Sequence, residues 1–322
     1  MKKIIITEND ESGRLDKLLM RVLSNAPKSF IYKMLRKKNI TLDGKKAAGN
    51  ELLKKGNEVA LFLSDETIAK FSKAKQVSET AGSINILFED DNIILINKEV
   101  GVLSQPDSDS SGDSVVERLV KYLKDRGEYS PSDISAFAPV VCNRLDRNTS
   151  GIVICAKNLV SAREISTGLK ERTIEKYYTA IVAGCLSGTG VIKMYYLKNS
   201  ETNEAIILNK PIKDAKEIIT EYESVKATDR YSILKMKLVT GKSHQIRAAL
   251  ANMGHPVLGD GKYGNYEING MLRRRFNIKY QLLHAESIAF GECQDKLGYL
   301  SGKKFECPLR DDFTVVIRAL DL

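Results

Sequence analysis

The chain has 322 residues, of which 43% are hydrophobic, so it is long enough for two domains with a sizeable core in at least one. No apolar run reaches the length of a membrane span, and the first ten residues lack the apolar stretch of a secretory signal. We therefore expect a cytoplasmic protein with no membrane segment. Five cysteines without a C-x-x-C pair and three histidines without metal-ligand spacing predict neither a disulfide framework nor a metal site.

Positive charge is concentrated near the start of the chain. The net charge is +9, and residues 1–60 hold 14 Lys and Arg against 7 Asp and Glu. Such a concentration is the electrostatic footprint of a phosphate-binding module, although a solvated lysine-rich surface explains it equally well. The candidate phosphate contacts are Lys28, Lys33, Arg36, Lys37, Lys38 and Lys45.

Residues 1–63 are predicted to form a compact unit of helices and strands. The expected elements are helices at 14–23 and 29–38 and short strands at 40–42 and 58–63. In the second helix Ile31, Met34 and Leu35 recur at helical spacing, so they form the inward face. The basic side chains of that helix then project outward. Residues 64–83 are polar without clear periodicity and are predicted to be a linker.

Residues 84–322 are predicted to form a second, mixed α/β domain. Strands are expected at 84–88, 92–97, 152–156 and 178–183, and a loop at 104–114. Helices are expected after Ser114, where Glu117 completes capping-box spacing, and at 161–172, where Ser161 and Glu164 have the same spacing. A further helix is expected to begin at Ser243 and to carry Arg247 in its first turn.

The polar loop between the predicted strands at 140–142 and 152–156 carries the most informative residues. Asp146 stands between Arg144 and Arg147, and nearby positive charge favours the ionised form of a carboxyl group. A rigid strand end would present this carboxylate as a nucleophile or base. From these residues alone, a structural aspartate that caps a turn is the simpler alternative.

Two resemblances to known families bear on these alternatives. The stretch from Arg144 to Gly151, Arg-Leu-Asp-Arg-Asn-Thr-Ser-Gly, resembles the catalytic signature of the RluA-type pseudouridine synthases. Residues 12–63, with Gly13-Arg14-Leu15-Asp16-Lys17 and Ile40-Thr41-Leu42-Asp43-Gly44-Lys45, resemble an S4-type RNA-binding domain. Together the resemblances imply an α+β protein: a small S4-like domain, a linker, and a pseudouridine synthase domain on a largely antiparallel sheet.

The resemblance also implies roles for site residues. Asp146 would be the catalytic aspartate, and Arg144 would fill the place that the target base leaves when it flips out of the RNA. The segment from Lys176 to Gly184 is similar to a family strand and places Tyr178 as the aromatic that stacks on the flipped uracil and takes part in proton removal. Arg247 resembles the family arginine that pairs with the catalytic aspartate. A half-buried core tyrosine is the alternative for Tyr178.

Two positions depart from the family pattern. Asn143 replaces the usual histidine before the signature, so we assign it no chemical role. Glu99 stands where proline is usual, which loosens a turn without touching the chemistry, because proline there sets backbone shape. His244 is expected to hold loop backbone rather than to donate protons. Residues 264–281, with Arg273, Arg274 and Arg275, are expected to form a surface loop. This loop either binds the RNA backbone near the cleft or is only exposed to solvent.

The function implied is isomerisation of uridine to pseudouridine in RNA by a monomer that needs no metal or other cofactor. The match of residues 26–37 to RluC-like members favours 23S ribosomal RNA over tRNA. Two rivals remain. A methyltransferase would need a glycine-rich cofactor motif, which is absent. A non-catalytic S4-type RNA-binding or ribosome assembly factor is kept open by Asn143 and Glu99.

Overall fold

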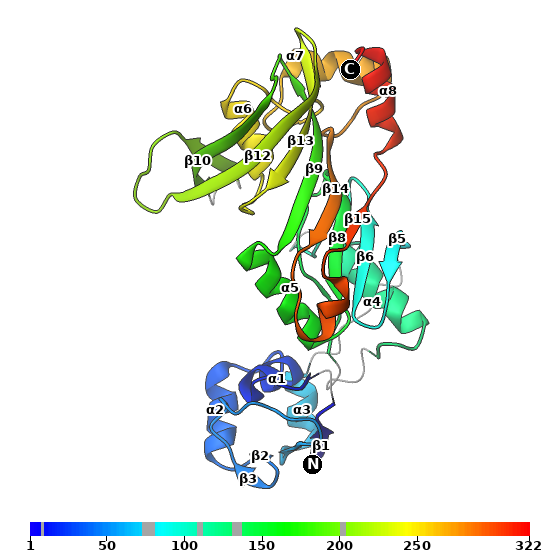
Figure 1. Cartoon of the computed structure of the whole chain (residues 1–322). Coiled ribbons are helices and arrows are strands. Elements are labelled where there is room, and N and C mark those ends of the chain that lie inside the picture. Colours follow the sequence, from blue (N-terminus) through cyan, green and yellow to red (C-terminus); the bar gives the residue numbers. More distant parts are fainter. Residues whose placement is uncertain (8–9, 73–80, 108–111, 131–136, 200–203) are drawn as a thin grey trace.

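The structure is a computed structural model that describes residues 1–7, 10–72, 81–107, 112–130, 137–199 and 204–322. An N-terminal unit and a larger unit follow one another along the chain, and the two termini lie at opposite ends of the molecule (Figure 1). Within the described part of the chain, no helix is both long and apolar enough to cross a membrane.

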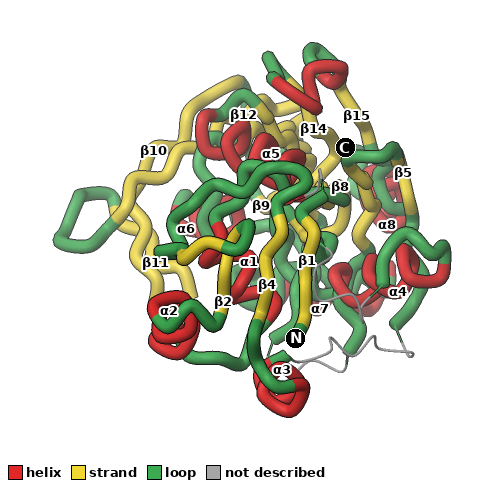
Figure 2. The backbone as a smooth tube through the Cα atoms, turned by 90° about the horizontal axis from the view of Figure 1, so that it is seen from below, coloured by secondary structure: helices red, strands yellow, loops and turns green. Residues whose placement is uncertain are grey.

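The N-terminal unit has its own four-stranded antiparallel sheet, in the order β1-β4-β2-β3. Its elements are β1 (Lys2–Ile5), α1 (Leu15–Val22), α2 (Lys28–Arg36), β2 (Ile40–Leu42), β3 (Lys45–Lys46), β4 (Glu58–Leu61) and α3 (Asp65–Phe71). Seen from below, β1 and β4 run side by side, with α2 and α3 at the margins of the unit (Figure 2). Ile31, Met34 and Leu35 are buried in its core, as their helical spacing predicts.

The first part of the predicted linker belongs to this unit. Residues 65–71 form α3, which the hydroxyl of Ser64 caps by accepting a hydrogen bond from the Thr67 amide. Ile68 enters the N-terminal core, and the ring of Phe71 lies 4.5 Å from that of Phe30. Only two apolar side chains anchor this helix, which is why periodicity did not reveal it. Residues 73–80 lie outside the described residues.

The larger unit is built on an eleven-stranded sheet. Along its main path the order is β11-β10-β12-β13-β9-β14-β8-β6-β5, with β15 beside β14 and β7 beside β8. Among the strands that the structure describes, β14 and β8 alone pair in parallel, so the expectation of a mixed α/β domain on a largely antiparallel sheet is confirmed. Its elements are β5 (Ile86–Glu89), β6 (Ile93–Lys98), α4 (Val115–Asp125), β7 (Val140–Val141), β8 (Ser150–Ala156), α5 (Leu159–Glu171), β9 (Ile174–Ala183), β10 (Thr189–Asn199), β11 (Glu204–Leu208), β12 (Lys216–Ala227), β13 (Tyr231–Leu238), α6 (Gln245–Asn252), α7 (Tyr266–Phe276), β14 (Leu283–Phe290), a 3₁₀ helix η2 (Asp295–Leu300), β15 (Lys304–Glu306) and α8 (Asp311–Ala319).

The central strands are buried on both faces, which explains their continuous apolar runs. On β6, Ile94 and Ile96 enter a core shared with α4 and α6, whereas Ile93 and Leu95 enter a second core shared with α5 and η2. A third cluster joins β9 and β13 to α7 and α8. Helices therefore cover both faces of the sheet, and β10 and β12 extend outward from the body of the unit (Figure 1).

Three local predictions about this unit need correction. The capping box of Ser114 and Glu117 is present, but α5 begins at Leu159 and is capped by Asn158, not Ser161, whose buried side chain lies inside the helix. The helix predicted from Ser243 begins at Gln245. Residues 266–276, expected in a surface loop, form α7, because Leu272 is fully buried and anchors the helix against the third core.

Candidate active site

Asp146 lies in the loop between β7 and β8, as the sequence predicts, with its side chain 24% exposed. The loop is fixed on one side by the segment after β6. The Ser104 hydroxyl lies 2.9 Å from both the carbonyl oxygen and the amide nitrogen of Leu145, donating to the first and accepting from the second. The amide of Thr149 closes the turn by donating to the carbonyl of Asp146 over 3.0 Å.

A fully buried lysine joins the end of β6 to the same loop. Lys98 Nζ donates to the carbonyls of Glu99, Val102 and Arg147 over 2.7, 2.9 and 3.0 Å. Burial lowers the pKa of Lys98 to about 7, although the negative charge of Asp146 opposes the shift. Three acceptors for three N–H groups compensate the lost hydration of the ammonium group.

The other end of the loop is held by residues from the C-terminal third of the chain. Gln281 Nε2 donates to Thr149 Oγ1 over 3.0 Å. The Ser150 hydroxyl accepts from Arg310 Nη1 at 2.9 Å and lies 2.7 Å from His284 Nδ1, so it can donate to that nitrogen. Next along β8, Gly151 has φ +110°, and a Cβ there would lie 2.3 Å from the carbonyl oxygen of Ala285. Only glycine allows β8 and β14 to approach this closely.

Arg247 is the partner of Asp146. Its Nη1 donates to Asp146 Oδ2 over 2.8 Å, while Nε and Nη2 donate to both oxygens of Asp260 over 2.7 and 2.8 Å. Burial disfavours the guanidinium charge, but the hydrogen bonds and charge of Asp260 outweigh it and raise the pKa of Arg247. Asp260 is itself buried, and its hydrogen bond from Arg247 overcomes burial and lowers its pKa. The guanidinium thus carries a fixed positive charge to the Asp146 carboxylate.

The arginines beside Asp146 in the sequence do not pair with it. Among the described residues, Asp146 forms ion pairs with Arg247 and, at 4.0 Å, with His244 if that ring is protonated. Arg147 Nε instead donates to the carbonyl of Gly101 over 2.9 Å. The source of positive charge inferred from sequence adjacency was therefore wrong, since the stabilising cation comes from α6, 101 residues later.

His244 also differs from its expected role. Its Nδ1 lies 2.9 Å from the Tyr263 hydroxyl, rather than binding loop backbone. That hydroxyl accepts from the Ala205 amide over 2.9 Å, so its own proton can go to Nδ1. Nε2 then carries the ring proton and faces Asp146 at 4.0 Å. Burial lowers the pKa of His244 and outweighs the opposing charge of Asp146, so the ring is mostly neutral near pH 7.

A pocket of about 580 Å³ opens in front of these groups. Asp146, Arg247, Arg144 and Tyr178 all line it, so the structure brings the predicted catalytic residues and Arg144 into one cavity. Pockets of this size accommodate small organic groups. No group of three or more His, Cys, Asp or Glu side chains in the described ranges could hold a metal ion.

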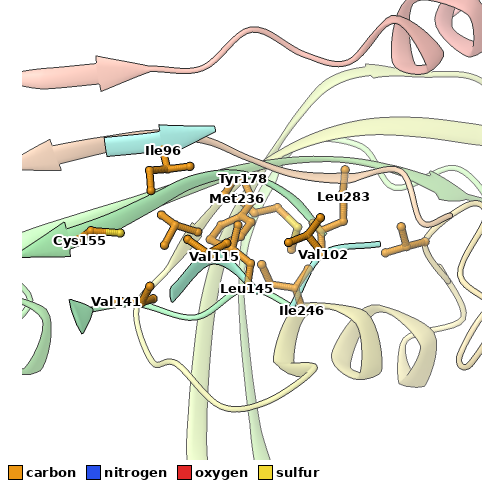
Figure 3. Close-up of a cluster of buried hydrophobic side chains, with 14 of the residues drawn as sticks. Ile96, Val102, Val115, Val141, Leu145, Cys155, Tyr178, Met236, Ile246 and Leu283 are labelled. Carbon is orange, nitrogen blue, oxygen red and sulfur yellow. The ribbon is translucent and has the colours of Figure 1, made fainter. Parts of the chain in front are cut away.

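Tyr178 forms part of the apolar wall of this pocket. It is 5% exposed and packs with Leu145, Met236 and Ile246 (Figure 3). Burial, with a smaller effect from the negative charge of Asp146, raises the pKa of Tyr178. Its hydroxyl has no hydrogen-bond partner among the described residues, so the ring offers an apolar face and a protonated hydroxyl to whatever occupies the pocket.

Asn143, at the position where histidine is usual, holds the loop against β8. Its Oδ1 accepts from the Ile154 amide over 2.7 Å, and its Nδ2 donates to the carbonyl of Ile152 over 3.3 Å. A carboxamide makes both contacts at once because it has a donor and an acceptor side by side. The departure from the family pattern therefore has a structural function here.

The basic residues predicted from the sequence lie elsewhere, on the N-terminal unit. Lys28, Lys33 and Arg36 are exposed on α2, and Lys37, Lys38 and Lys45 are exposed just after it and on β3. None of the six forms an ion pair among the described residues, and the single acid between them, Asp43, instead accepts hydrogen bonds from Asn57 and the Glu58 amide. Their charge is thus available to an external anion.

The buried histidine behind the loop predicts a pH dependence of stability. Burial lowers the pKa of His284 to about 4, below the ordinary 6.5, so the unfolded chain binds the proton first as the pH falls. The contribution of His284 is complete above pH 6.5 and is lost towards pH 4, a change on the order of 3 kcal/mol. His284→Gln, which keeps a donor and an acceptor without titrating, should flatten the rise in unfolding free energy between pH 4 and 6.5 measured by urea denaturation. Equal pH slopes in the two proteins would contradict this assignment.

Comparison with known proteins identifies the family of the chain. Residues 92–252 match the model of the RNA pseudouridylate synthase family. A ribosomal large subunit pseudouridine synthase C of Buchnera aphidicola is 30% identical, covering 98% of this chain and 96% of the relative, and one of Rickettsia conorii is 29% identical over 90% and 92%. The solved structure of human RNA Pseudouridylate Synthase Domain Containing 4 covers 74% of this chain and 93% of its own, with a TM-score of 0.58 at 20% identity, and shows the same fold. The chain therefore belongs to the family of RNA pseudouridine synthases.

Proposed function

We propose that this enzyme converts uridine to pseudouridine in 23S ribosomal RNA, with Asp146 as its catalytic carboxylate. The observation that carries the proposal is the Asp146 side chain, held 2.8 Å from Arg247 in a pocket that it shares with Tyr178. The reaction breaks the bond from C1′ of ribose to N1 of uracil, rotates the base, and forms a bond from C1′ to C5. N1 gains a proton and C5 loses one, so substrate and product are isomers.

Asp146 is suited to work at the ribose. An ionised carboxylate can add to C1′ or remove the 2′ proton. The pairing with Arg247 holds Oδ2 of Asp146, while Oδ1 accepts no hydrogen bond from the described residues. The charge-assisted contact fixes the carboxylate orientation before substrate arrives. Because Arg247 is held in turn by Asp260, the geometry does not depend on a single exposed side chain.

Access to the ribose requires the target nucleotide to leave its stack, at a cost of roughly a few kcal/mol. Arg144 is exposed at the edge of the pocket, where its side chain can enter the gap left in the RNA. Tyr178 supplies an aromatic face for the extruded uracil inside the pocket. In this role Tyr178 remains a neutral phenol, because its raised pKa disfavours the phenolate that would act as a base.

Replacing Asp146 tests the assignment. Asp146→Asn should reduce pseudouridine formation by at least ~10³-fold, because the amide cannot add to C1′ or accept the 2′ proton. The assay follows release of tritium from C5-labelled uridine in RNA. RNA affinity should change little, since the carboxylate does not bind phosphate. Glu223→Gln, which neutralises an exposed carboxylate on β12, is the matched control. Normal turnover by Asp146→Asn would leave the catalytic role of this residue without support.

The N-terminal unit is the proposed RNA anchor, in the manner of an S4 domain. Its six exposed cations, which have no ion-pair partner in the described part of the chain, lie on α2 and on the turn and strand after it. This surface is suited to bind along a phosphate backbone. The relatives named large-subunit synthases support ribosomal RNA as the target, with tRNA as the alternative. We also propose that the protein acts as a monomer in the cytoplasm. A non-catalytic assembly factor would keep RNA binding but form no pseudouridine in the tritium assay.

The basic surface of α2 predicts a salt effect. Changing Lys33, Arg36 and Lys37 together to Gln should weaken RNA binding and reduce the slope of log affinity against log salt by about 0.7 to 0.9 for each phosphate that these side chains neutralise. The rate at saturating RNA should be unchanged, because these residues lie outside the pocket. The control is the charge-preserving triple variant K33R/R36K/K37R. An unchanged slope in the Gln variant would show that this surface is merely solvated.

A further inference from the structure

The active-site pocket is lined by more positive charge than the catalytic groups require. Six lysines and arginines border it, against two aspartates. Asp146 is matched by Arg247, and Asp107 also has a partner. Lys176, Lys198 and Lys242 have no ion-pair partner within 4.0 Å among the described residues, and no role in the chemistry proposed above needs them. All three therefore add positive charge to the border of the cavity.

Lys176 is the most unusual of the three. It lies on β9 two residues before Tyr178, so both side chains emerge from the same face of the sheet, towards the pocket. The loop between β13 and α6 passes beside it, and Lys176 Nζ lies 3.5 Å from the point that a Cβ at Gly241 would occupy. Burial lowers the pKa of Lys176, and no nearby carboxylate offsets that effect.

Lys98 and Lys176 differ in the hydrogen-bond acceptors around their ammonium groups. Lys98 is fully buried, whereas Lys176 is half-buried, and three carbonyls accept all of the N–H groups of Lys98. Lys176 makes no hydrogen bond or ion pair within the described part of the chain. A partly desolvated ammonium group that has no acceptor from the described residues can still donate three hydrogen bonds. A ligand in the pocket that carries oxygen atoms can accept them.

We propose that Lys176, with Lys242 beside it on the neighbouring loop, forms a subsite that binds a backbone phosphate next to the extruded uridine. The proposal rests on the proposed function, in which this pocket receives the target nucleotide. A phosphodiester is the permanent anion of RNA, and lysine binds phosphate as a compact point charge. Gly241 precedes Lys242 in the chain and lies close to Lys176 Nζ, and it has no side chain to block the approach of the phosphate.

With this subsite, strand β9 would bind both the base and a phosphate of the target nucleotide. Tyr178 and Lys176 stand side by side on β9, so stacking of the base and capture of the phosphate would be set by one rigid strand. Phosphate contacts position a nucleic acid without reading its sequence. Lys176 would therefore contribute to how tightly the nucleotide is held in the pocket and not to which uridine is chosen.

Kinetics at several salt concentrations test the subsite. With an RNA on which the wild-type protein forms pseudouridine, beginning with transcripts of large-subunit ribosomal RNA, Lys176→Met should raise KM about tenfold, because one charge-assisted hydrogen bond is removed. The slope of log(1/KM) against log salt should fall by about 0.7, as expected for one phosphate on a single strand. The kcat should stay within about threefold. Lys176→Arg keeps the charge and should keep the slope.

Lys237→Met is the matched control. Lys237 lies on the adjacent strand β13 but on the opposite face of the sheet, where Glu175 at 2.5 Å neutralises it. Removing this charge should leave KM and the salt slope unchanged. A fall in kcat with unchanged KM and slope in Lys176→Met would instead assign the lysine to the uracil oxygens and overturn the phosphate subsite. No change in any parameter would overturn it as well.

A measurement on the wild-type protein covers the case in which Lys176→Met does not fold. Bound RNA should shield Lys176 from reductive methylation, read by mass spectrometry, while Lys237 reacts equally with and without RNA. Equal labelling of Lys176 in both states would contradict the proposal. Failure of the wider proposed function is distinguishable, because it would appear as normal turnover by Asp146→Asn, whatever the salt slope of the Lys176 variant.

Discussion

The proposed active site depends on one guanidinium group that is held from two sides. Asp260 accepts two hydrogen bonds from Arg247 and leaves Nη1 to reach Asp146. Burying an arginine costs free energy unless it is paired and hydrogen-bonded, and here the Asp260 side chain, itself buried, supplies that pairing. The protein interior therefore fixes the position of this positive charge. The hydrogen bond from Arg247 in turn fixes the position of the partly exposed Asp146 carboxylate.

The loop that carries Asp146 is fixed by contacts that are distant in sequence. Lys98 and Ser104 hold it from the segment after β6, while Gln281 and His284 hold Thr149 and Ser150 from β14 and the segment just before it. Lys98 and His284 belong to strands of the sheet, and Ser104 and Gln281 are buried in the segments beside those strands. The loop therefore has little freedom to adjust to substrate. The conformational entropy of the loop is lost when the protein folds, so it is not lost again when the substrate binds.

Strong local patterns made much of the fold predictable. The continuous apolar run in β8 and the capping box of α4 each specify one structure with little help from the rest of the chain. The start of α5 was misplaced because Asn158 and Ser161 both satisfy local cap chemistry, and only tertiary packing decides between them. α7 was not predicted because only one of its residues, Leu272, is buried, so the sequence shows no clear apolar periodicity among its charged residues.

The sequence predicted only those site residues that lie in motifs resembling those of the family. Asp146, Tyr178 and Arg247 were found by resemblance, and the structure places all three at one pocket. Asp260 was not recognised as the partner of Arg247, because nothing in the sequence pairs an aspartate with an arginine 13 residues away. Lys98 and Lys176 are likewise the same residue type, and only coordinates of their surroundings show that one is saturated with acceptors and the other is not.

The most direct test of the central claim is a crystal structure of Asp146→Asn bound to its RNA substrate. We predict an unstacked uridine in the pocket, with its base against Tyr178 and the Arg144 side chain in the gap left in the RNA. The C1′ atom should lie within roughly 3.5 Å of the side chain at position 146. A target base that stays stacked in the RNA, or a ribose that lies outside this pocket, would contradict the claim.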